Sequence, residues 1–275
     1  MSQFPYRGRI APSPTGYMHL GHAKTFWTAF ERCRQAGGTL IYREEDIDTQ
    51  RCKDSFAHAA VVDLQQLGID WDDGPIRQSE RTALYAATLQ QLISKGFAYP
   101  CHASRKMIKE HPETQISSEG ESIFPQKLRP NDAVAPDSPV DLKVNWRFRV
   151  PDERKISFED LNLGPHSFLS QIDFGDFLVW RRDGMPSYEL AVVVDDIDMK
   201  ITEVVRGADL LVSTARQLLL YEALDAEPPA FYHESLVLDE SGKRLAKRKD
   251  SLALRTLFSQ GHTRESIQSL WSARS

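Results

Sequence analysis

Cysteine is scarce in this sequence, with three residues, Cys33, Cys52 and Cys101, among 275. They stand far apart and form neither a CxxC pair nor an even set, so no disulfide framework and no thioredoxin-type redox motif is predicted. Free cysteines of this kind are typical of a reducing compartment. We therefore expect a cytoplasmic protein.

Long apolar runs are also absent from the sequence. No stretch approaches the roughly 20 residues that a membrane-spanning helix needs. The N-terminus carries Arg7 and Arg9 with no apolar run behind them, which does not fit a secretory signal. We expect no membrane partner.

A strong charge of one sign is missing as well. Lysine and arginine number 34 against 39 acidic residues, which gives a formal net charge of −5 and a pI of about 5.9. An overall basic surface for nucleic acid is thereby excluded, and any RNA contact must come from local patches. The loop after the first predicted strand also lacks G-x-G-x-x-G, which argues against a dinucleotide-binding protein.

The pattern that is present alternates strands with helices. Residues 7–11 predict a strand and residues 21–35 a helix, followed by a β-branched and aromatic strand at 39–43. Helical patterns follow at 53–68 and 79–95. Alternation of this kind predicts an α/β fold with a parallel, doubly wound sheet.

The middle of the chain breaks this pattern. From about 104 to 141 the periodicity fails and prolines punctuate a polar stretch, which predicts an irregular insert. Beyond it, strands are predicted at 144–150, 177–181, 189–194 and 202–205, a helix at 213–224, and a short helical segment after Thr263. We predict three segments: a first half of the catalytic domain at 1–100, an inserted smaller lobe at 101–185, and a second half at 186–275.

Two histidines, His19 and His22, flank Gly21 where the first strand's loop meets the first helix. A helix N-terminus offers free N–H groups and a positive dipole end to phosphate. Two imidazoles at this point could stabilise an α-phosphate during its transfer, and glycine lets a purine ring approach the backbone closely. An isolated match of this kind is equally typical of capping or surface histidines.

A basic run, Lys243-Arg244-Leu245-Ala246-Lys247-Arg248-Lys249, lies on a predicted loop near the other end of the chain. Five cations could neutralise pyrophosphate as it leaves. A solvated basic turn would have the same composition. The alternation of strands and helices between this run and the two histidines would bring both to the carboxyl edge of one sheet.

The segment Arg9 to Gly16, followed by His19-Leu20-Gly21-His22, closely resembles the opening of the glutamyl-tRNA synthetase family, whose signature here is the HIGH motif. The similarity continues through residues 42–48, 186–188 and 205–210, and the basic run resembles the family's KMSKS motif. The resemblance implies the Rossmann-like parallel sheet of class I aminoacyl-tRNA synthetases. It covers nearly the whole chain except the insert.

The resemblance also implies site residues. A glutamate pocket would have Glu45 for the α-amino group, Tyr188 and Arg206 on its far side, and one wall made by Arg9, Ile10, Ala11, Pro12 and Ser13. ATP, with Mg²⁺, would lie on His19, Gly21, His22 and Lys247, and the two histidines and the lysine would be catalytic. The inventory suits a dicarboxylic amino acid, which needs cations for two carboxylates and an anion for its ammonium group. Taken singly, Arg206 could instead pair with Asp209 or Asp195, and Glu45 could belong to a solvated acidic turn.

Only 26 residues follow Lys249. In this respect the chain resembles the glutamyl-queuosine tRNA(Asp) synthetases, a group that forms glutamyl-adenylate without tRNA and attaches glutamate to queuosine at the wobble position of tRNA(Asp). The resemblance therefore implies L-glutamate, ATP and queuosine-containing tRNA(Asp) as partners of what we expect to be a monomer. A free-standing glutamyl-tRNA synthetase of ordinary acceptor specificity and a noncatalytic glutamate- or adenylate-binding module remain as alternatives.

Three departures from the family pattern qualify these expectations. Cys101 has no later cysteine to join it and only His102 and His111 nearby, so no zinc site is predicted. Ala246 replaces the serine of the KMSKS motif. Glu189 follows Tyr188 where the family commonly has asparagine, which would add negative charge beside the pocket for an acidic amino acid.

Overall fold

The N-terminal part of the fold is a parallel three-stranded sheet with two helices. The computed structural model describes residues 5–130, 140–237 and 253–272. Strand β1 (Arg7–Ile10) pairs with β2 (Thr39–Glu44), which pairs in turn with β3 (Asp73–Arg77). Helices α1 (Leu20–Gln35) and α2 (Asp54–Gln66) connect these strands. These elements confirm the strand–helix alternation predicted for this region.

A second set of parallel strands continues the layer. Strand β9 (Glu203–Gly207) pairs with β10 (Ala230–Glu234), and helix α6 (Leu211–Ala223) connects them. The edge of β1 meets the start of β9, where Thr202 N–H donates to the carbonyl of Arg7 over 2.9 Å. The carboxyl ends of β1 and β9 therefore lie at the same edge of the fold, where ligands of open α/β sheets bind.

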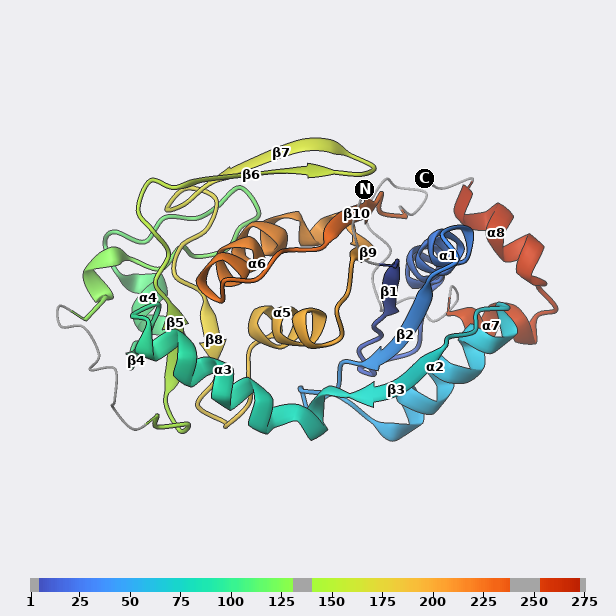
Figure 1. Cartoon of the computed structure of the whole chain (residues 1–275), viewed down its shortest axis with the longest axis horizontal. Coiled ribbons are helices and arrows are strands. Elements are labelled where there is room, and N and C mark those ends of the chain that lie inside the picture. The colour runs from blue at the N-terminus through green and yellow to red at the C-terminus, as the bar shows by residue number, and fades with distance from the viewer. Residues whose placement is uncertain (1–4, 131–139, 238–252, 273–275) are drawn as a thin grey trace.

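A smaller lobe stands at the other end of the molecule (Figure 1). Its sheet is antiparallel and consists of β4 (Ala98–Cys101), β5 (Asn145–Phe148) and β8 (Leu178–Trp180). The 3-10 turn Gln78–Arg81 and helix α3 (Thr82–Ser94) lead into it. Helix α4 (Arg105–Glu110) and the 3-10 turn Gln126–Leu128 fall in the stretch that was predicted to be irregular.

A β-hairpin that the sequence did not predict lies across α6. It consists of β6 (Lys155–Asp160) and β7 (Gly164–Leu169), which run along one side of the molecule in Figure 1. Its strand β6 pairs in parallel with β10 through Asp160 and Phe231. The hairpin belongs to the segment predicted as an inserted lobe, yet it extends the strands of the following segment. The three-segment division of the chain stays a prediction.

The strand predicted at 189–194 was wrong, because this stretch lies in helix α5 (Tyr188–Asp198). Ser187 caps the helix, with its side chain accepting from the N–H of Leu190 over 3.3 Å. Residues 189–196 are all buried, so the apolar run has no exposed side. Periodicity cannot separate a buried helix from a buried strand, and the β-branched valines favoured the wrong alternative.

Two hydrophobic clusters hold the fold together. One joins α3, α5 and α6 to the antiparallel sheet. The other surrounds β1, β2 and α1 and includes side chains of α7 (Leu254–Ser259) and α8 (Arg264–Ser272). The α8 helix confirms the helical segment predicted after Thr263, and α8 packs against α1. Within the described ranges, no helix is long and apolar enough to cross a membrane.

Candidate active site

A cavity of about 350 Å³ opens where the carboxyl ends of β1 and β9 meet the start of α1. Nearly all of the predicted glutamate and ATP residues line it, namely Arg9, Ala11, Pro12, Ser13, His19, Gly21, His22, Glu45, Tyr188 and Arg206. Ile10 does not, because neighbouring side chains of a strand point to opposite faces, and Ile10 lies fully buried in the hydrophobic cluster around α1. The prediction of Ile10 as a wall of the pocket is corrected accordingly.

The two histidines form a capping box at the start of α1. The Nδ1 atom of His19 accepts from the N–H of Gly21 over 3.2 Å, and Nδ1 of His22 accepts from the N–H of His19 over 3.3 Å. The rings are stacked with centroids 3.8 Å apart. A neutral ring that accepts at Nδ1 carries its proton at Nε2. Capping and phosphate binding therefore use different ring atoms, since capping occupies Nδ1 and the N–H donor of each ring is at Nε2.

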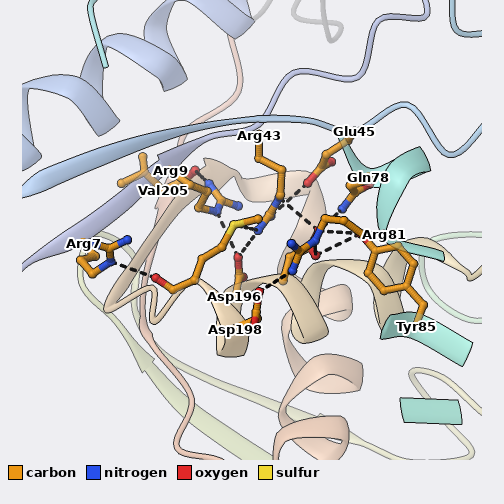
Figure 2. Close-up of polar contacts among 12 residues, drawn as sticks. Arg7, Arg9, Arg43, Glu45, Gln78, Arg81, Tyr85, Asp196, Asp198 and Val205 are labelled. Atoms are coloured by element: carbon orange, nitrogen blue, oxygen red, sulfur yellow. Dashed lines mark hydrogen bonds and ion pairs between the residues drawn. The ribbon is translucent and has the colours of Figure 1, made fainter. Parts of the chain in front are cut away.

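A buried charge network supports the opposite wall (Figure 2). Arg43 is fully buried and donates to Asp196 Oδ1 over 2.5 Å and to Glu45 Oε1 over 3.1 Å. Arg9 donates from NH1 to the carbonyl of Val205 over 2.8 Å, and its Nε lies 4.0 Å from Asp196 Oδ1. Arg43 and Asp196 thus fix the positions of Glu45 and Arg9, which are an anion and a cation of the cavity wall.

The network continues away from the cavity through Asp195. This carboxylate accepts from Gln78 over 2.8 Å, from Arg81 Nε over 2.8 Å and from the hydroxyl of Tyr85 over 3.0 Å. Figure 2 shows Gln78, Arg81 and Tyr85 at the N-terminal end of α3. Asp195 is therefore engaged by other donors and is not the partner of Arg206 that the sequence left open.

Arg206 is buried and held on two sides. Its Nε donates to His233 Nε2 over 3.2 Å, and NH2 donates to the hydroxyl of Thr214 over 2.7 Å. The third nitrogen, NH1, is buried and has no hydrogen-bond partner among the described residues. A buried donor without a partner is costly unless a ligand satisfies it. Arg206 lines the cavity, so its guanidinium charge lies beside the space that an anion would occupy.

Burial shifts the pKa values of the groups around the cavity. It lowers the pKa of Arg9, an effect that Asp196 opposes, and raises the pKa of Glu45, an effect that Arg43 and Arg9 oppose. Burial and the charge of Glu45 raise the pKa of Tyr188 to about 12. Tyr188 therefore remains a protonated hydrogen-bond donor at neutral pH.

Glu189 points away from the cavity. Its carboxylate accepts from Ser213 Oγ over 2.9 Å and from Gln217 Nε2 over 2.9 Å, and Arg216 NH1 lies 3.7 Å from it. Arg216 also pairs with Glu121. The extra negative charge expected beside the glutamate pocket is thus neutralised by partners on α6, and Arg216 contacts internal carboxylates.

The smaller lobe contains a buried carboxylate, Asp176, and the cysteine Cys101. Asp176 accepts from the hydroxyl of Tyr99 over 2.5 Å, from Arg129 Nε over 2.7 Å and from the N–H of Val150 over 3.0 Å. Cys101 packs with Ile108 and Phe124 in a small apolar cluster. In the part of the chain that the structure describes, no three His, Cys, Asp or Glu side chains are grouped to hold a metal ion.

The predicted ATP lysine, Lys247, lies outside the described residues, as does the rest of the basic run. The described residues on either side of it both reach the site. Val237 lines the cavity, and Ala253 forms an antiparallel bridge with His19. The N–H of Leu254 donates to the carbonyl of Met18 over 2.8 Å.

Three buried residues behind Arg206 were missed by the sequence analysis: Asp160, Thr214 and His233. Thr214 lay in the helix predicted at 213–224, where no residue was singled out. Asp160 ends a strand that was not predicted, and His233 stands alone in a strand with no motif around it. The one available signal was a histidine in an otherwise apolar and aromatic stretch, which is more often a satisfied core residue.

The chain matches the sequence model of the family described as tRNA synthetases class I (E and Q), catalytic domain, over residues 6–270. It is 42% identical over 266 residues to the glutamyl-Q tRNA(Asp) synthetase of Nitratidesulfovibrio vulgaris, covering 93% of this chain and 82% of that protein. It is also 42% identical over 274 residues to the protein of the same name from Symbiobacterium thermophilum, covering 94% of this chain and 83% of that one.

Similarity extends to longer proteins. A glutamate–tRNA ligase of Synechococcus sp. is 37% identical over 95% of this chain, which spans 55% of the ligase. Among solved structures, a glutamate tRNA ligase from Elizabethkingia meningosepticum in complex with its amino acid superposes with a TM-score of 0.75 at 30% identity, covering 90% of this chain and 53% of the ligase. The chain thus spans about half the length of these ligases.

Proposed function

Because this chain belongs to the class I (E and Q) tRNA synthetase catalytic-domain family, we propose that it activates L-glutamate with ATP and transfers the glutamyl group to queuosine at the wobble position of tRNA(Asp). Activation would not need tRNA. Two relatives named glutamyl-Q tRNA(Asp) synthetase, each 42% identical and matched over more than four-fifths of its own length, support this acceptor.

The observation that carries the substrate assignment is the charge inventory of the cavity wall. Two buried guanidinium groups, Arg9 and Arg206, and the buried carboxylate of Glu45 face the same space. Asp209 and the buried Glu234 also line it, and Glu234 is neutralised by Lys24, whose Nζ lies 2.8 Å from Oε2. Free glutamate has two carboxylates and one ammonium group, which match the charges of Arg9, Arg206 and Glu45 in sign and number. Arg206, with NH1 unsatisfied, would bind the side-chain carboxylate, and Glu45 would bind the ammonium group.

The chemistry would proceed in two displacements. First, an oxygen of the glutamate α-carboxylate attacks the α-phosphorus of ATP, and the bond from that phosphorus to pyrophosphate breaks. Next, a queuosine hydroxyl attacks the carbonyl of the mixed anhydride and AMP leaves with the bonding electron pair, while the hydroxyl loses its proton. Positioning and charge neutralisation are the main contributions asked of the protein.

The histidine pair would act on the first displacement. With Nδ1 of both rings engaged in the capping box, the Nε2–H groups of His19 and His22 would donate to α-phosphate oxygens as negative charge builds up. Gly21 would let the adenine approach the backbone. We assign pyrophosphate neutralisation to Lys247, and Mg²⁺ would arrive with the triphosphate, as is usual for nucleotides.

Glutamate incorporation into three RNAs tests the proposal. The RNAs are tRNA(Asp) with queuosine, the same tRNA with guanosine at that position, and tRNA(Glu), each with ATP and labelled glutamate. We expect label in the queuosine form alone. Label in tRNA(Glu) would instead identify an ordinary glutamyl-tRNA synthetase, to which the Synechococcus ligase is similar.

A matched pair of variants tests whether the activity depends on the cavity. Arg206→Met removes the buried cation, whereas Arg154→Met removes an arginine that is exposed and pairs with Glu222 on the surface. Glutamate-dependent exchange of pyrophosphate into ATP, without tRNA, should fall at least about 100-fold in the first variant and stay unchanged in the second. Absence of exchange in the unmodified protein would favour a noncatalytic binding module.

A further inference from the structure

We propose that Asp160 and His233 form a positioning pair that aims Arg206 at the side-chain carboxylate of glutamate and so supports discrimination against glutamine. The inference rests on the proposed function and deepens it. None of the three side chains is near another in sequence, since Asp160 ends β6, Arg206 lies in β9 and His233 lies in β10. Pairing of these strands brings them together.

Asp160 fixes the orientation of the His233 ring. Its Oδ1 accepts from the N–H groups of Asn162 and Leu163 over 3.0 and 2.9 Å. Its Oδ2 lies 2.6 Å from Nδ1 of His233. Burial raises the pKa of Asp160, but the hydrogen bond from His233 and those from the backbone outweigh it and leave this pKa below its usual value. An ionised carboxylate can only accept, so the proton of the ring lies on Nδ1.

This tautomer leaves a lone pair on Nε2, which accepts from Nε of Arg206 over 3.2 Å. Thr214 completes the arrangement, because its hydroxyl accepts from NH2 of Arg206 over 2.7 Å. Its one proton can go to the carbonyl of Leu210, 3.1 Å away, or to Nε2 of His233, 3.0 Å away, and both are acceptors in this tautomer. A guanidinium group is planar, so fixing Nε and NH2 also fixes the direction of NH1. NH1 is the nitrogen without a partner among the described residues.

A neutral histidine suits this task better than a carboxylate. An aspartate or glutamate at position 233 would pair directly with Arg206 and compete with the substrate for its charge. A neutral imidazole holds the guanidinium in place and leaves its charge for the cavity. Burial and the charge of Arg206 lower the pKa of His233 to about 4, so the ring is neutral at physiological pH.

Two substitutions at position 233 test the roles of the two imidazole nitrogens separately. His233→Asn keeps an N–H donor near the position of Nδ1 but removes the acceptor for Arg206. His233→Gln keeps an acceptor near the position of Nε2. In tRNA-independent pyrophosphate exchange we expect the Asn variant to raise KM for glutamate roughly 10- to 100-fold and to leave KM for ATP unchanged. The ratio of kcat/KM for glutamate to that for glutamine should fall. The Gln variant should retain most of the affinity for glutamate.

Nitrogen NMR of the imidazole provides a readout that does not depend on activity. In the unmodified protein near pH 7, His233 should show a protonated Nδ1 and an unprotonated Nε2, and Asp160→Asn should shift the ring toward the other tautomer. A protonated Nε2 in the unmodified protein overturns the inference even if the Asn variant fails to fold. So does an unchanged KM for glutamate in a folded Asn variant.

The two proposals fail in distinguishable ways. If the unmodified protein shows no glutamate-dependent exchange, the proposed function fails, whatever the tautomer of His233 is. If the unmodified protein is active and the Asn and Gln variants raise KM for glutamate equally, the positioning role of the Nε2 acceptor is wrong while the function stands.

Discussion

At the scale of single residues, burial has opposite consequences for charges that have partners and charges that do not. Arg43 is fully buried but contacts carboxylates on several sides. Asp63, on α2, is also buried, and neither of its carboxylate oxygens has a hydrogen-bond partner within the described ranges. Burial therefore raises the pKa of Asp63 to about 6, an effect that the charge of Arg255 opposes.

We predict that Asp63→Asn stabilises the protein at neutral pH. The folded state holds the proton of Asp63 up to about pH 6, whereas the unfolded chain loses it near pH 3.8. The folded state thus binds more protons in this interval, and the stability contributed by the group falls as pH rises through it. The variant should gain about 1–3 kcal/mol at pH 7.5 and little at pH 4. Urea unfolding at both pH values measures this, and an equal effect at the two would contradict the prediction.

At the scale of elements, one ion network joins β2, the start of α3 and α5. Arg43 from β2 contacts Asp195 and Asp196 of α5, and Arg81 reaches Asp195 from the start of α3. Such a network contributes little more to the free energy of folding than apolar packing of the same volume would. Removing one partner is nevertheless strongly destabilising, because it leaves a buried charge unpaired. The network also contacts Arg9 and Glu45, which line the cavity. A change in the geometry of the network would therefore move these two side chains.

Arg43→Met should therefore destabilise the fold by about 3–5 kcal/mol. Arg154→Met, which breaks an exposed pair with Glu222, should cost no more than about 0.5 kcal/mol. Chemical denaturation of both variants compares the two. A small loss in the Arg43 variant would mean that Asp195 and Asp196 are adequately held by their other donors.

At the scale of the whole molecule, the cavity is built from both halves of the parallel layer. Ser13, His19 and Glu45 come from the N-terminal half, and Tyr188 and Arg206 come from the later one. A ligand that spans glutamate and nucleotide sites would contact both halves at once. Binding to the folded state alone stabilises it by an amount that depends on ligand concentration.

A nonhydrolysable glutamyl-adenylate analogue at 100 times its Kd should raise the free energy of unfolding by about 2.7 kcal/mol. The glutaminyl analogue at the same concentration should produce a smaller increase, because Arg206 would face a neutral amide. Thermal unfolding with each compound measures the difference. Equal stabilisation by both would count against a role of Arg206 in recognising the side-chain carboxylate.

The sequence by itself determined the parts of this protein that depend on short, contiguous signals. The strand–helix alternation of residues 7–66 and the cluster of Arg9, His19 and His22 lie in segments where turn chemistry and helix capping act locally. Such segments adopt nearly the same geometry wherever they occur, so the class of fold could be predicted from them. The residues expected around the cavity followed from the resemblance to the glutamyl-tRNA synthetase family.

Only the tertiary structure decided how these residues are supported. The buried run at 189–194 has no exposed side, and capping by Ser187 with packing on every face made it a helix. Because side chains of a strand alternate between its two faces, the side chain of Ile10 lies in the hydrophobic core. The contact of Asp160 with His233 spans 73 residues and that of Arg43 with Asp196 spans 153. Contacts across such separations depend on strand pairing and on the shared burial of charges, which no local pattern encodes.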